Sequence, residues 1–327
     1  MSLRFNSLLL AAALAGLAFA LMLADIAPLA AQGAKPVDFQ FGVIRGLTTS
    51  NLAKENGAFD RRLGEAGARL VWRGPYPGTP YEALAAGQVD ATFTTSTNAA
   101  PAVLGNAKFK IFGYQEPDLD GEGVWVKKGA GINSLADLKG RKIASDKGGS
   151  GHHVLLKALD RAGISPKDVD ISYFDPADAL AAFNGGQVEA IATWRTFGAS
   201  AETKGNGVKL VSGRDVGSEN LLIYIVREQF AKEHPRTIKA AFDALRESAA
   251  ESAKDPAATA RLWEKLGNLD PKVAPIFVPP ASRELHAVTP ALIPILDNAA
   301  NLFVKYGVIP RAPDYSRMLF NVSDVKG

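Results

Sequence analysis

Two stretches of this chain repeat nearly the same local pattern, 99 residues apart. Residues 82–93 have the sequence EALAAGQVDATF, and residues 181–192 have the sequence AAFNGGQVEAIA. In each stretch an apolar helical end is followed by a Gly-Gln-Val-Asp/Glu turn and then by an apolar run typical of a buried strand. Polar residues follow both strands, Thr-Thr-Ser-Thr-Asn at 94–98 and Thr-Trp-Arg-Thr at 193–196. The repeat predicts two similar α/β lobes that present different polar groups to a shared cleft.

The first residues differ in composition from the rest of the chain. Arg4 precedes a run of sixteen residues at 8–23 that carries no charge, and small residues follow at Ala30 and Ala31. A basic start, an apolar run of this length and a small-residue cleavage region indicate a secretory signal peptide. The alternative, a membrane anchor, requires about 20 apolar residues. We therefore expect residues 1–31 to be a signal peptide that is cleaved near Ala31.

Cysteine is absent from the whole sequence, and this excludes two covalent features that exported proteins can have. A lipoprotein anchor needs a cysteine for acylation and a disulfide needs two, so we expect neither. The 327 residues are 47% apolar and 22% charged, which is ordinary for a soluble globular protein. A net charge of only +3 without a basic tract argues against a nucleic-acid partner. We expect an exported, non-lipidated protein of the periplasm of a diderm bacterium.

The sequence after the signal peptide alternates between strand-like and helix-like segments. The alternation runs from residue 37 to 127 and again from 128 to 213, which predicts α/β domains with largely parallel sheets. Residues 219–227 (ENLLIYIVR) resemble a strand that returns to the first lobe, and the remainder is mostly helical. Two crossings between the lobes, near 121–127 and 212–222, would form a double-stranded hinge that permits closure around a ligand.

Five segments carry a family resemblance. They are SLADLKGRKIA at 134–144, DKGGSGHHVLLKAL at 146–159, YFDPADALAAFNGGQVEAIATW at 173–194, FAKEHP at 230–235 and YGVIP at 306–310. In this order and spacing they resemble the aliphatic-sulfonate, taurine and nitrate-type substrate-binding proteins of ABC importers. The resemblance implies an α/β, two-lobed periplasmic-binding-protein fold (type II) with a double-stranded hinge and a ligand cleft between the lobes. It also implies a small-molecule anion as ligand and an inner-membrane ABC permease as partner.

On this fold we assign residues 36–124 and 214–327, with the C-terminal helices, to lobe 1 and residues 125–213 to lobe 2. We expect a monomer. The sequence departs from the family at the end of the repeated strand of lobe 2, where Trp-Asp-Pro is usual and Trp194-Arg195-Thr196 stands here. In lobe 1, Thr-Ser-Thr-Asn at 95–98 replaces the usual Gly-Asp. The loss of two acidic positions and the gain of an arginine favour an anion without a free ammonium group.

The glycine-rich loop at 146–151 is a candidate anion-binding site in lobe 2. It lies between a predicted strand and a predicted helix, where backbone N–H groups attract anions, with Gly149 permitting close approach and Ser150 adding a hydroxyl donor. The alternative is that the glycines only permit a tight turn. His152, in the first turn of the helix, either donates to an oxyanion or packs internally. The loop does not match the P-loop pattern, which argues against nucleotide hydrolysis.

Two residues at the end of the repeated strand of lobe 2 are further candidates. Trp194 either packs against the carbon chain of a ligand or belongs to the core. Arg195 either pairs with a sulfonate, carboxylate or phosphate, or forms a salt bridge between the lobes.

Lobe 1 contributes candidates from two strand ends. Thr95 and Ser96 follow the repeated strand, and we expect Asn98 to cap the next helix. Arg45, Thr48 and Thr49 occupy the first strand–helix loop, and ligands of parallel α/β sheets bind at the carboxyl ends of strands.

The sequence therefore predicts a binding protein for an aliphatic-sulfonate-like anion and not an enzyme. It shows no nucleophile elbow, metal cluster or cofactor fingerprint, so we expect no catalytic residue, cofactor or metal. Three alternatives stay open: a different solute such as a nitrate-like ion or a pyrimidine precursor, a membrane sensor as partner, and an exported enzyme that uses His152 as a general base.

Overall fold

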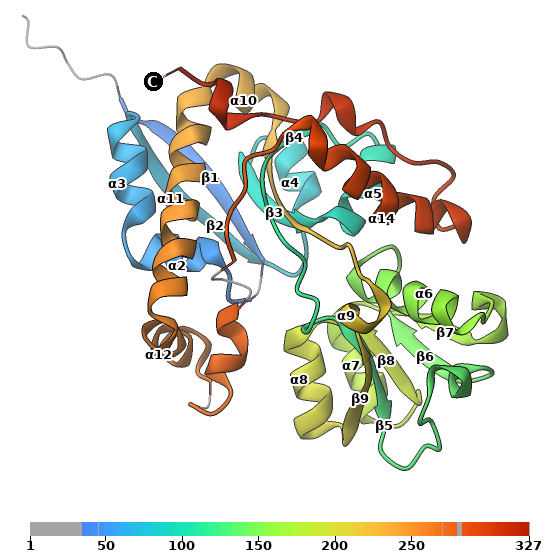
Figure 1. Cartoon of the computed structure of the whole chain (residues 1–327). Helices are drawn as coiled ribbons and strands as arrows, with labels where there is room; N and C mark the ends of the chain where they lie inside the picture. The colour runs from blue at the N-terminus through green and yellow to red at the C-terminus, as the bar shows by residue number, and fades with distance from the viewer. Residues whose placement is uncertain (1–34, 45, 270, 280–282, 327) are drawn as a thin grey trace, which may run out of the picture. The chain divides into compact units, whose positions relative to one another are not determined.

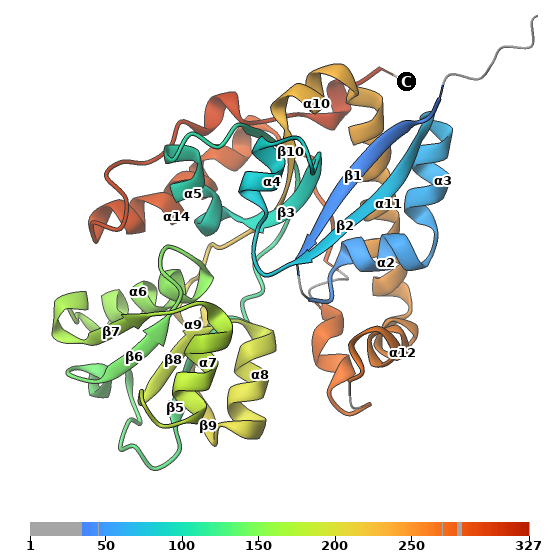
Figure 2. The same cartoon turned by 180° about the vertical axis from the view of Figure 1, so that it is seen from behind.

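The computed structural model describes residues 35–44, 46–269, 271–279 and 283–326. The predicted signal peptide at 1–31 lies outside the described residues. Contacts divide the chain after Val37, and residues 38–327 form one compact unit that contains two five-stranded sheets (Figures 1 and 2). In the described part of the chain, no helix has both the length and the apolar character needed to cross a bilayer.

The first sheet has the strand order β2-β1-β3-β10-β4. β1 and β3 are parallel, with Phe41 opposite Ala91, whereas β10 is antiparallel to both β3 and β4. The return of the chain to this sheet, predicted for 219–227, is confirmed by β10. The strands are β1 (Val37–Ile44), β2 (Ala68–Tyr76), β3 (Ala91–Thr95), β4 (Phe109–Gln115) and β10 (Leu222–Arg227).

The second sheet has the equivalent order β7-β6-β8-β5-β9. β6 is parallel to β7 and β8, and β5 is antiparallel to β8 and β9. Both sheets are therefore mixed, because the fourth strand of each runs against its two neighbours. The strands are β5 (Gly123–Lys127), β6 (Lys142–Ser145), β7 (Asp170–Tyr173), β8 (Ala190–Thr193) and β9 (Gly207–Ser212).

Two chain segments connect the sheets. The first crossing, residues 116–122, leads from β4 to β5, and the second, residues 213–221, leads from β9 through α9 (Gly213–Val216) to β10. The strands beside the crossings approach closely, since a Cβ atom on Gly123 would lie 2.4 Å from the carbonyl oxygen of Val211. The two crossings form the predicted double-stranded hinge, and the antiparallel strand of each sheet follows one of them. The predicted lobe limits at 124/125 and 213/214 stay predictions.

Helices pack on both faces of the first sheet because the side chains of β10 alternate between the faces. Ile223 and Ile225 join one buried cluster with residues of α4, α5 and α14, while Tyr224 packs between Phe93 and Phe112 on the other face. On that other face α3 contacts β2, and α11 contacts α3. The helices of this lobe are α2 (Thr49–Glu55), α3 (Ala58–Glu65), α4 (Tyr81–Ala85), α5 (Ser96–Leu104), α10 (Glu228–Glu233), α11 (Pro235–Lys254), α12 (Pro256–Gly267) and α14 (Ile293–Lys305), with a short 3-10 turn η3 (Ala274–Phe277).

The second sheet is covered in the same way. Val124 and Val126 of β5 pack with the apolar side of α6, while Trp125 between them packs against α7 and α8. α8 lies so close that a Cβ atom on Gly198 would be 2.2 Å from the Trp125 ring. The helices are α6 (Ser150–Ala162), α7 (Pro176–Asn184) and α8 (Arg195–Lys204).

The repeated sequence forms the same helix–turn–strand unit in both lobes, as predicted. It connects α4 to β3 and α7 to β8, and each of these strands is third in its sheet. In the first unit the N–H of Asp90 donates to the carbonyl of Gln40 at 2.8 Å, and the Asp90 carboxylate accepts from the Gln40 N–H at 2.9 Å. In the second, Glu189 makes the same reciprocal pair with Lys142 at 2.9 and 3.2 Å. The acid of each repeat thus fixes the start of its strand against the neighbouring parallel strand.

Candidate functional site

Candidate ligand residues from both lobes are linked to the first crossing. Three polar side chains at or in this segment, Gln115, Asp118 and Glu122, bond to candidates directly or through one intermediate residue. Gln115 contacts Thr49, and Asp118 contacts Arg195. Glu122 is linked through Asn220 to Ser96 and Ser150. None of the three was singled out from the sequence.

Arg195 binds Asp118 through a two-pronged ion pair. Its Nε donates to Asp118 Oδ2 at 2.7 Å and its Nη2 to Oδ1 at 2.6 Å, while Arg283 Nη2 reaches the same Oδ1 at 2.7 Å. A third donor of Arg195, Nη1, bonds the carbonyl of Ile276 in η3 at 2.8 Å. Arg195 therefore makes the salt bridge that the sequence left open as its alternative role. Its contact with a ligand stays a prediction.

Two arginines and one carboxylate leave this cluster with excess positive charge. Burial raises the pKa of Asp118, but the hydrogen bonds and charges of Arg195 and Arg283 outweigh burial and hold the pKa below its usual value. Asp118 is therefore ionised at neutral pH and neutralises one of the two guanidinium groups. The three side chains Asp118, Arg195 and Arg283 together therefore carry one net positive charge.

The candidates of the first strand–helix loop have different surroundings. Thr49 is buried and donates from Oγ1 to Gln115 Oε1 at 3.2 Å, and Tyr224 donates to the same oxygen at 3.3 Å. Thr48 is the N-cap of α2, and its backbone N–H and hydroxyl both donate to Asn51 Oδ1 at 3.0 Å. Arg45 lies outside the described residues. Thr49 thus joins the crossing, whereas Thr48 bonds residues of its own helix.

Thr95, and not Asn98, caps α5. The helix begins at Ser96, and Thr95 Oγ1 accepts from the N–H of Asn98 at 3.4 Å and from its Nδ2 at 3.0 Å. The sequence placed the cap three residues too late because two hydroxyl residues stand between them. Ser96 is buried and accepts from the N–H of Leu221 at 3.1 Å. Ser96 therefore connects the end of β3 to the second crossing.

The N-terminus of α6 is occupied by a carboxylate of the chain itself. Asp146 accepts from the N–H of His152 at 3.2 Å and also from the N–H of Gly151. A Cβ atom on Gly149 would lie 1.7 Å from the Asp146 carboxylate, so the glycine permits this close approach. Burial raises the pKa of Asp146 to about 6 against the opposing effect of these N–H groups, so the group is mostly ionised at pH 7. An anionic ligand would meet Asp146 at these amides, which weakens the sequence argument for an anion there.

Ser150 connects the two lobes. It is the first residue of α6 and is buried, and its Oγ accepts from Asn220 Nδ2 at 2.8 Å and lies 3.5 Å from Thr95 Oγ1. The hydroxyl groups of Thr95, at the end of β3, and of Ser150, at the start of α6, therefore face each other. This proximity is the arrangement expected of groups that share one ligand.

His152 is engaged on both ring nitrogens. Nδ1 accepts from the N–H of Gly148 at 3.1 Å, so the proton of the neutral ring is on Nε2, which donates to the Tyr173 oxygen at 3.0 Å. Burial, with a smaller effect of Lys147, lowers the pKa of His152 to about 4. These contacts favour the internal packing role over donation to an oxyanion.

Trp194 is the N-cap of α8 and is partly buried. Its ring meets that of Phe197 edge-on, with 5.1 Å between the centroids. The contact of Trp194 with a ligand stays a prediction.

Glu122 is the most deeply buried acid of the hinge. Ser218 donates to its Oε2 at 2.7 Å, and Asn220 Nδ2 donates to its Oε1. Burial raises the pKa of Glu122 to about 8, so the carboxyl group is largely protonated at pH 7. In the sequence its only signal is an acid placed directly before the apolar run of β5.

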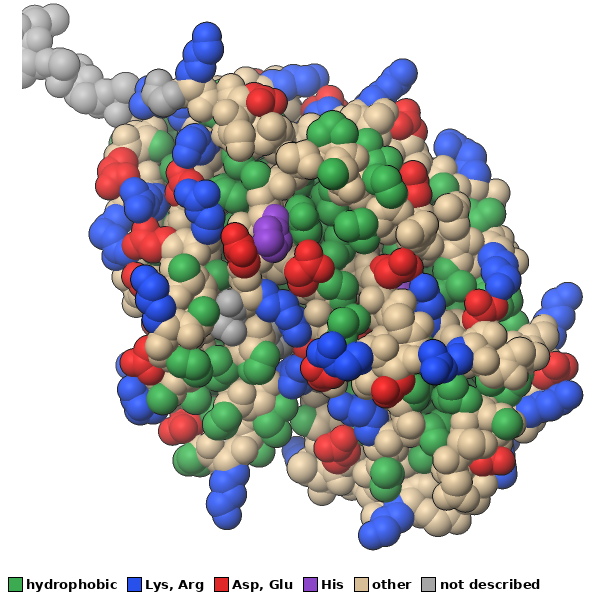
Figure 3. Space-filling view, in the orientation of Figure 1, with side chains coloured by type: hydrophobic (Ala, Val, Ile, Leu, Met, Phe, Trp, Pro, Cys, Tyr) green, Lys and Arg blue, Asp and Glu red, His purple; other side chains and the backbone are tan. Residues whose placement is uncertain are grey.

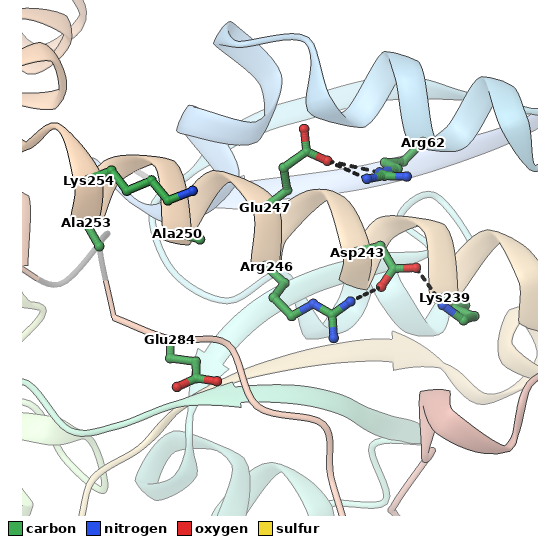
Figure 4. A pocket seen from close by; sticks show the side chains of 9 residues that line it. All are labelled: Arg62, Lys239, Asp243, Arg246, Glu247, Ala250, Ala253, Lys254 and Glu284. Atoms are coloured by element: carbon green, nitrogen blue, oxygen red, sulfur yellow. Dashed lines mark hydrogen bonds and ion pairs between the residues drawn. The ribbon is translucent and has the colours of Figure 1, made fainter.

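A large cavity among the described residues contains none of the candidates. It has a volume of about 730 Å³ and lies along α11 (Figure 4), where Glu247 pairs with Arg62 and Asp243 pairs with Lys239 and Arg246. Side chains of both charges alternate across the face seen in Figure 3. This mixture does not distinguish the cavity as an anion site. A smaller cavity of about 60 Å³ lies beside Arg195 and Ile276.

Comparisons with known proteins identify the family. A sequence profile of the family described as NMT1/THI5 like matches residues 73–259, more than half of the chain. A protein of Bacillus subtilis (strain 168) named as an aliphatic-sulfonate-binding protein is 32% identical over 241 residues, which cover 72% of this chain and 71% of that protein. The chain belongs to the NMT1/THI5-like family.

Further comparisons cover nearly the whole NMT1/THI5-like chain. A protein of Escherichia coli (strain K12), also named as an aliphatic-sulfonate-binding protein, is 26% identical over 297 residues, 89% of this chain and 91% of that one. The alkanesulfonate-binding protein SsuA from Xanthomonas axonopodis pv. citri, solved bound to MOPS, has a TM-score of 0.80 at 23% identity and covers 88% of this chain and 99% of its own. The NMT1/THI5-like chain therefore has the two-lobed periplasmic-binding-protein fold predicted from its sequence.

The same fold also occurs in an enzyme. The desulfurization enzyme DszB has a TM-score of 0.67 to this NMT1/THI5-like chain at 13% identity, covering 87% of this chain and 96% of its own. The fold alone therefore does not distinguish a binding protein from an enzyme, and the function has to be inferred from the side chains of the site.

Proposed function

We propose that this chain is the exported solute-binding component of an ABC importer and that it binds a small organic anion of the aliphatic-sulfonate type by hinge closure. The observation that carries the anion is the meeting of Arg195 of α8 and Arg283 of the C-terminal segment on the single carboxylate of Asp118. Guanidinium groups bind planar or tetrahedral oxyanions through paired N–H donors. The names of the relatives support a sulfonate as that anion.

The contacts between the lobes support hinge closure. Arg195 of α8 bonds Asp118 of the first crossing and Ile276 of η3, and Ser150 of α6 faces Thr95 of β3, so groups from both lobes meet. A ligand that replaces or extends these contacts stabilises the closed arrangement only as far as it binds that arrangement more tightly than the open one. Delivery to an inner-membrane permease from the periplasm, as a monomer that carries no lipid, is part of the same proposal.

The contacts of His152 favour binding over catalysis. A general base near neutral pH needs a free ring nitrogen and a pKa close to 7. His152 has a pKa of about 4, and its unprotonated nitrogen already accepts from Gly148. The residue that the sequence offered as a general base is therefore poorly suited to that role.

Isothermal titration calorimetry of the chain without residues 1–31 tests the proposal. The ligands are ethanesulfonate, hexanesulfonate, taurine, hexanoate, nitrate and cytosine, and we expect an alkanesulfonate to bind most tightly. Arg195→Ala should weaken that binding about ten- to a hundredfold, the usual effect of losing a hydrogen bond to a charged group. The matched control is Arg69→Ala, which removes an exposed ion pair with Asp38 at 2.6 Å. Failure of every sulfonate to bind, or equal affinity in the Arg195 variant, would contradict the proposal.

A further inference from the structure

Asn220 is a buried amide whose every polar atom has a partner. It lies in the second crossing, with Nδ2 donating to Ser150 Oγ at 2.8 Å and to Glu122 Oε1. Its Oδ1 accepts from Thr97 Oγ1 at 2.8 Å and from the Thr97 backbone N–H at 3.4 Å. A backbone N–H is a donor under all conditions, so the amide oxygen has to face Thr97. The NH₂ group therefore faces Ser150 and Glu122.

This orientation determines what the Ser150 hydroxyl does. A serine hydroxyl has one proton to donate and two lone pairs to accept with. Because Ser150 Oγ accepts from Asn220, its own proton points elsewhere. Its nearest acceptor among the described contacts is Thr95 Oγ1 at 3.5 Å, which is beyond the usual range for hydroxyl pairs of about 2.5–3.0 Å. Thr95 Oγ1 also accepts from Asn98 Nδ2 at 3.0 Å. The Ser150 proton is thus only weakly used within the protein.

Neighbouring residues hold Asn220 in this orientation from both ends. Glu122 accepts one of its two amide protons and is itself bonded to Ser218, which lies on the same crossing as Asn220. Ser96 adds a third group on the oxygen side, with its Oγ 3.5 Å from Oδ1. Rotation of the amide by 180° would place donors against the Thr97 N–H and break these contacts together. The amide is therefore fixed by residues of lobe 1 and of both crossings.

We propose that Asn220 is a positioning residue that makes the Ser150 hydroxyl a hydrogen-bond donor to the ligand, and so selects ligands that present an acceptor oxygen. The inference rests on the proposed function, because it concerns the same anion. It assigns Asn220 no contact with the ligand. Its effect is transmitted through Ser150, and it explains how a site beside the Asp146 carboxylate and the protonated carboxyl group of Glu122 presents a donor to the ligand.

The variant Asn220→Asp tests this assignment, because aspartate has the same shape but replaces the NH₂ group by oxygen. The aspartate would accept from Ser150 and turn the hydroxyl proton away from the ligand. We expect hexanesulfonate affinity, measured by calorimetry at pH 7.5, to fall about ten- to a hundredfold. Asn133→Asp, which adds the same charge at an exposed position of lobe 2, should change the affinity by less than about twofold.

A double-mutant cycle with Ser150→Ala separates polarity from simple charge repulsion or misfolding. If Asn220 acts through the Ser150 hydroxyl, Asn220→Asp should lower the affinity for hexanesulfonate by less than about threefold in the Ser150→Ala background, because no hydroxyl proton is left to reorient. Equal losses in both backgrounds would overturn the assignment while leaving the proposed function in place. The wild-type protein is titrated first. If it binds no sulfonate, both proposals fail.

Discussion

Arg195 and Asp118 lie 77 positions apart in the sequence and bind each other through two parallel hydrogen bonds, of 2.7 and 2.6 Å. Asp118 belongs to the hinge, and Arg195 begins the helix after the repeated strand of lobe 2. The side chains are only 19% and 15% exposed, so water screens this pair less than a surface ion pair. The arginine that distinguishes this chain from its family pattern is therefore paired with a carboxylate of the hinge.

Asp118→Asn should strengthen anion binding. The substitution keeps the shape of the side chain but removes the negative charge that competes with a ligand for Arg195 and Arg283. A unit charge a few ångströms away contributes about 1 kcal/mol in a water-like medium, which corresponds to about fivefold in affinity. Calorimetry with hexanesulfonate at two salt concentrations measures the change, with Asp38→Asn as the control for an exposed pair. Weaker binding would show instead that Asp118 is needed to orient Arg195.

Glu122 should make stability depend on pH. Burial raises its pKa from 4.5 to about 8, so between these values the folded protein keeps a proton that the unfolded chain loses. The free energy of unfolding should then fall as pH rises through this window, by up to about 1.4 kcal/mol per pH unit from this group. Urea unfolding at pH 5, 6, 7 and 8 should show a shallower dependence for Glu122→Gln. The exposed Glu65→Gln serves as control, and a slope unchanged by Glu122→Gln would contradict the assignment.

Two adjacent histidines should limit stability in acid. Burial, with a smaller effect of Lys157, lowers the pKa of His153 to about 3, and the pKa of His152 is about 4. Both pKa values lie below the usual value of 6.5, so the unfolded chain takes up protons on these histidines before the folded protein does. The free energy of unfolding that is present above pH 6.5 is therefore lost as pH falls towards 4.

His153→Leu removes one of these groups without leaving a polar atom unpaired, because neither ring nitrogen of His153 has a partner. The variant should lose less stability than the wild type between pH 6.5 and 4.5, by up to about 1.4 kcal/mol per pH unit. Denaturant midpoints across that range measure the difference. The partly exposed His234→Gln is the comparison, and parallel curves for His153→Leu and wild type would refute the prediction.

Two glycine-to-alanine variants in helices should have opposite effects. At Gly198 the added Cβ would lie 2.2–2.7 Å from three ring atoms of Trp125, whose Nε1 is held by Glu202 at 2.7 Å. We expect the free energy of unfolding of this variant to fall by about 1–3 kcal/mol. At Gly64 in α3 nothing lies within 4 Å of the new atom, so alanine should gain about 0.5–1 kcal/mol. Thermal and urea unfolding of both proteins measure the pair, and equal signs would show that packing against Trp125 does not decide the outcome.

The fold could be predicted because its signals are local. Each repeated unit contains its helix end, its turn and its strand within twelve residues, and the structure places both strands third in their sheets. Helix starts were less well predicted. Thr95 caps α5 three residues before the cap expected at Asn98, because several hydroxyl residues in this segment can occupy the cap position.

The network around the candidate residues could not be predicted in the same way. Thr95, Ser96 and Ser150 stand at strand and helix ends, where ligand residues are expected. Asp118, Glu122 and Asn220 lie in irregular segments without hydrophobic periodicity, and their partners are 70 to 165 positions away. Such contacts depend on how the two crossings approach each other. The sequence contains the residues but not their pairing.

The reciprocal hydrogen bonds of Asp90 and Glu189 have a consequence for how such a protein changes over evolution. They fix each repeated strand just before its first residue, whereas the candidate ligand side chains stand at or after its last residue. Register and recognition are therefore carried by opposite ends of the same strand. Substitutions at the far ends of β3 and β8 therefore leave the hydrogen bonds that align both sheets in place, which allows the proposed ligand residues to change without a change of register.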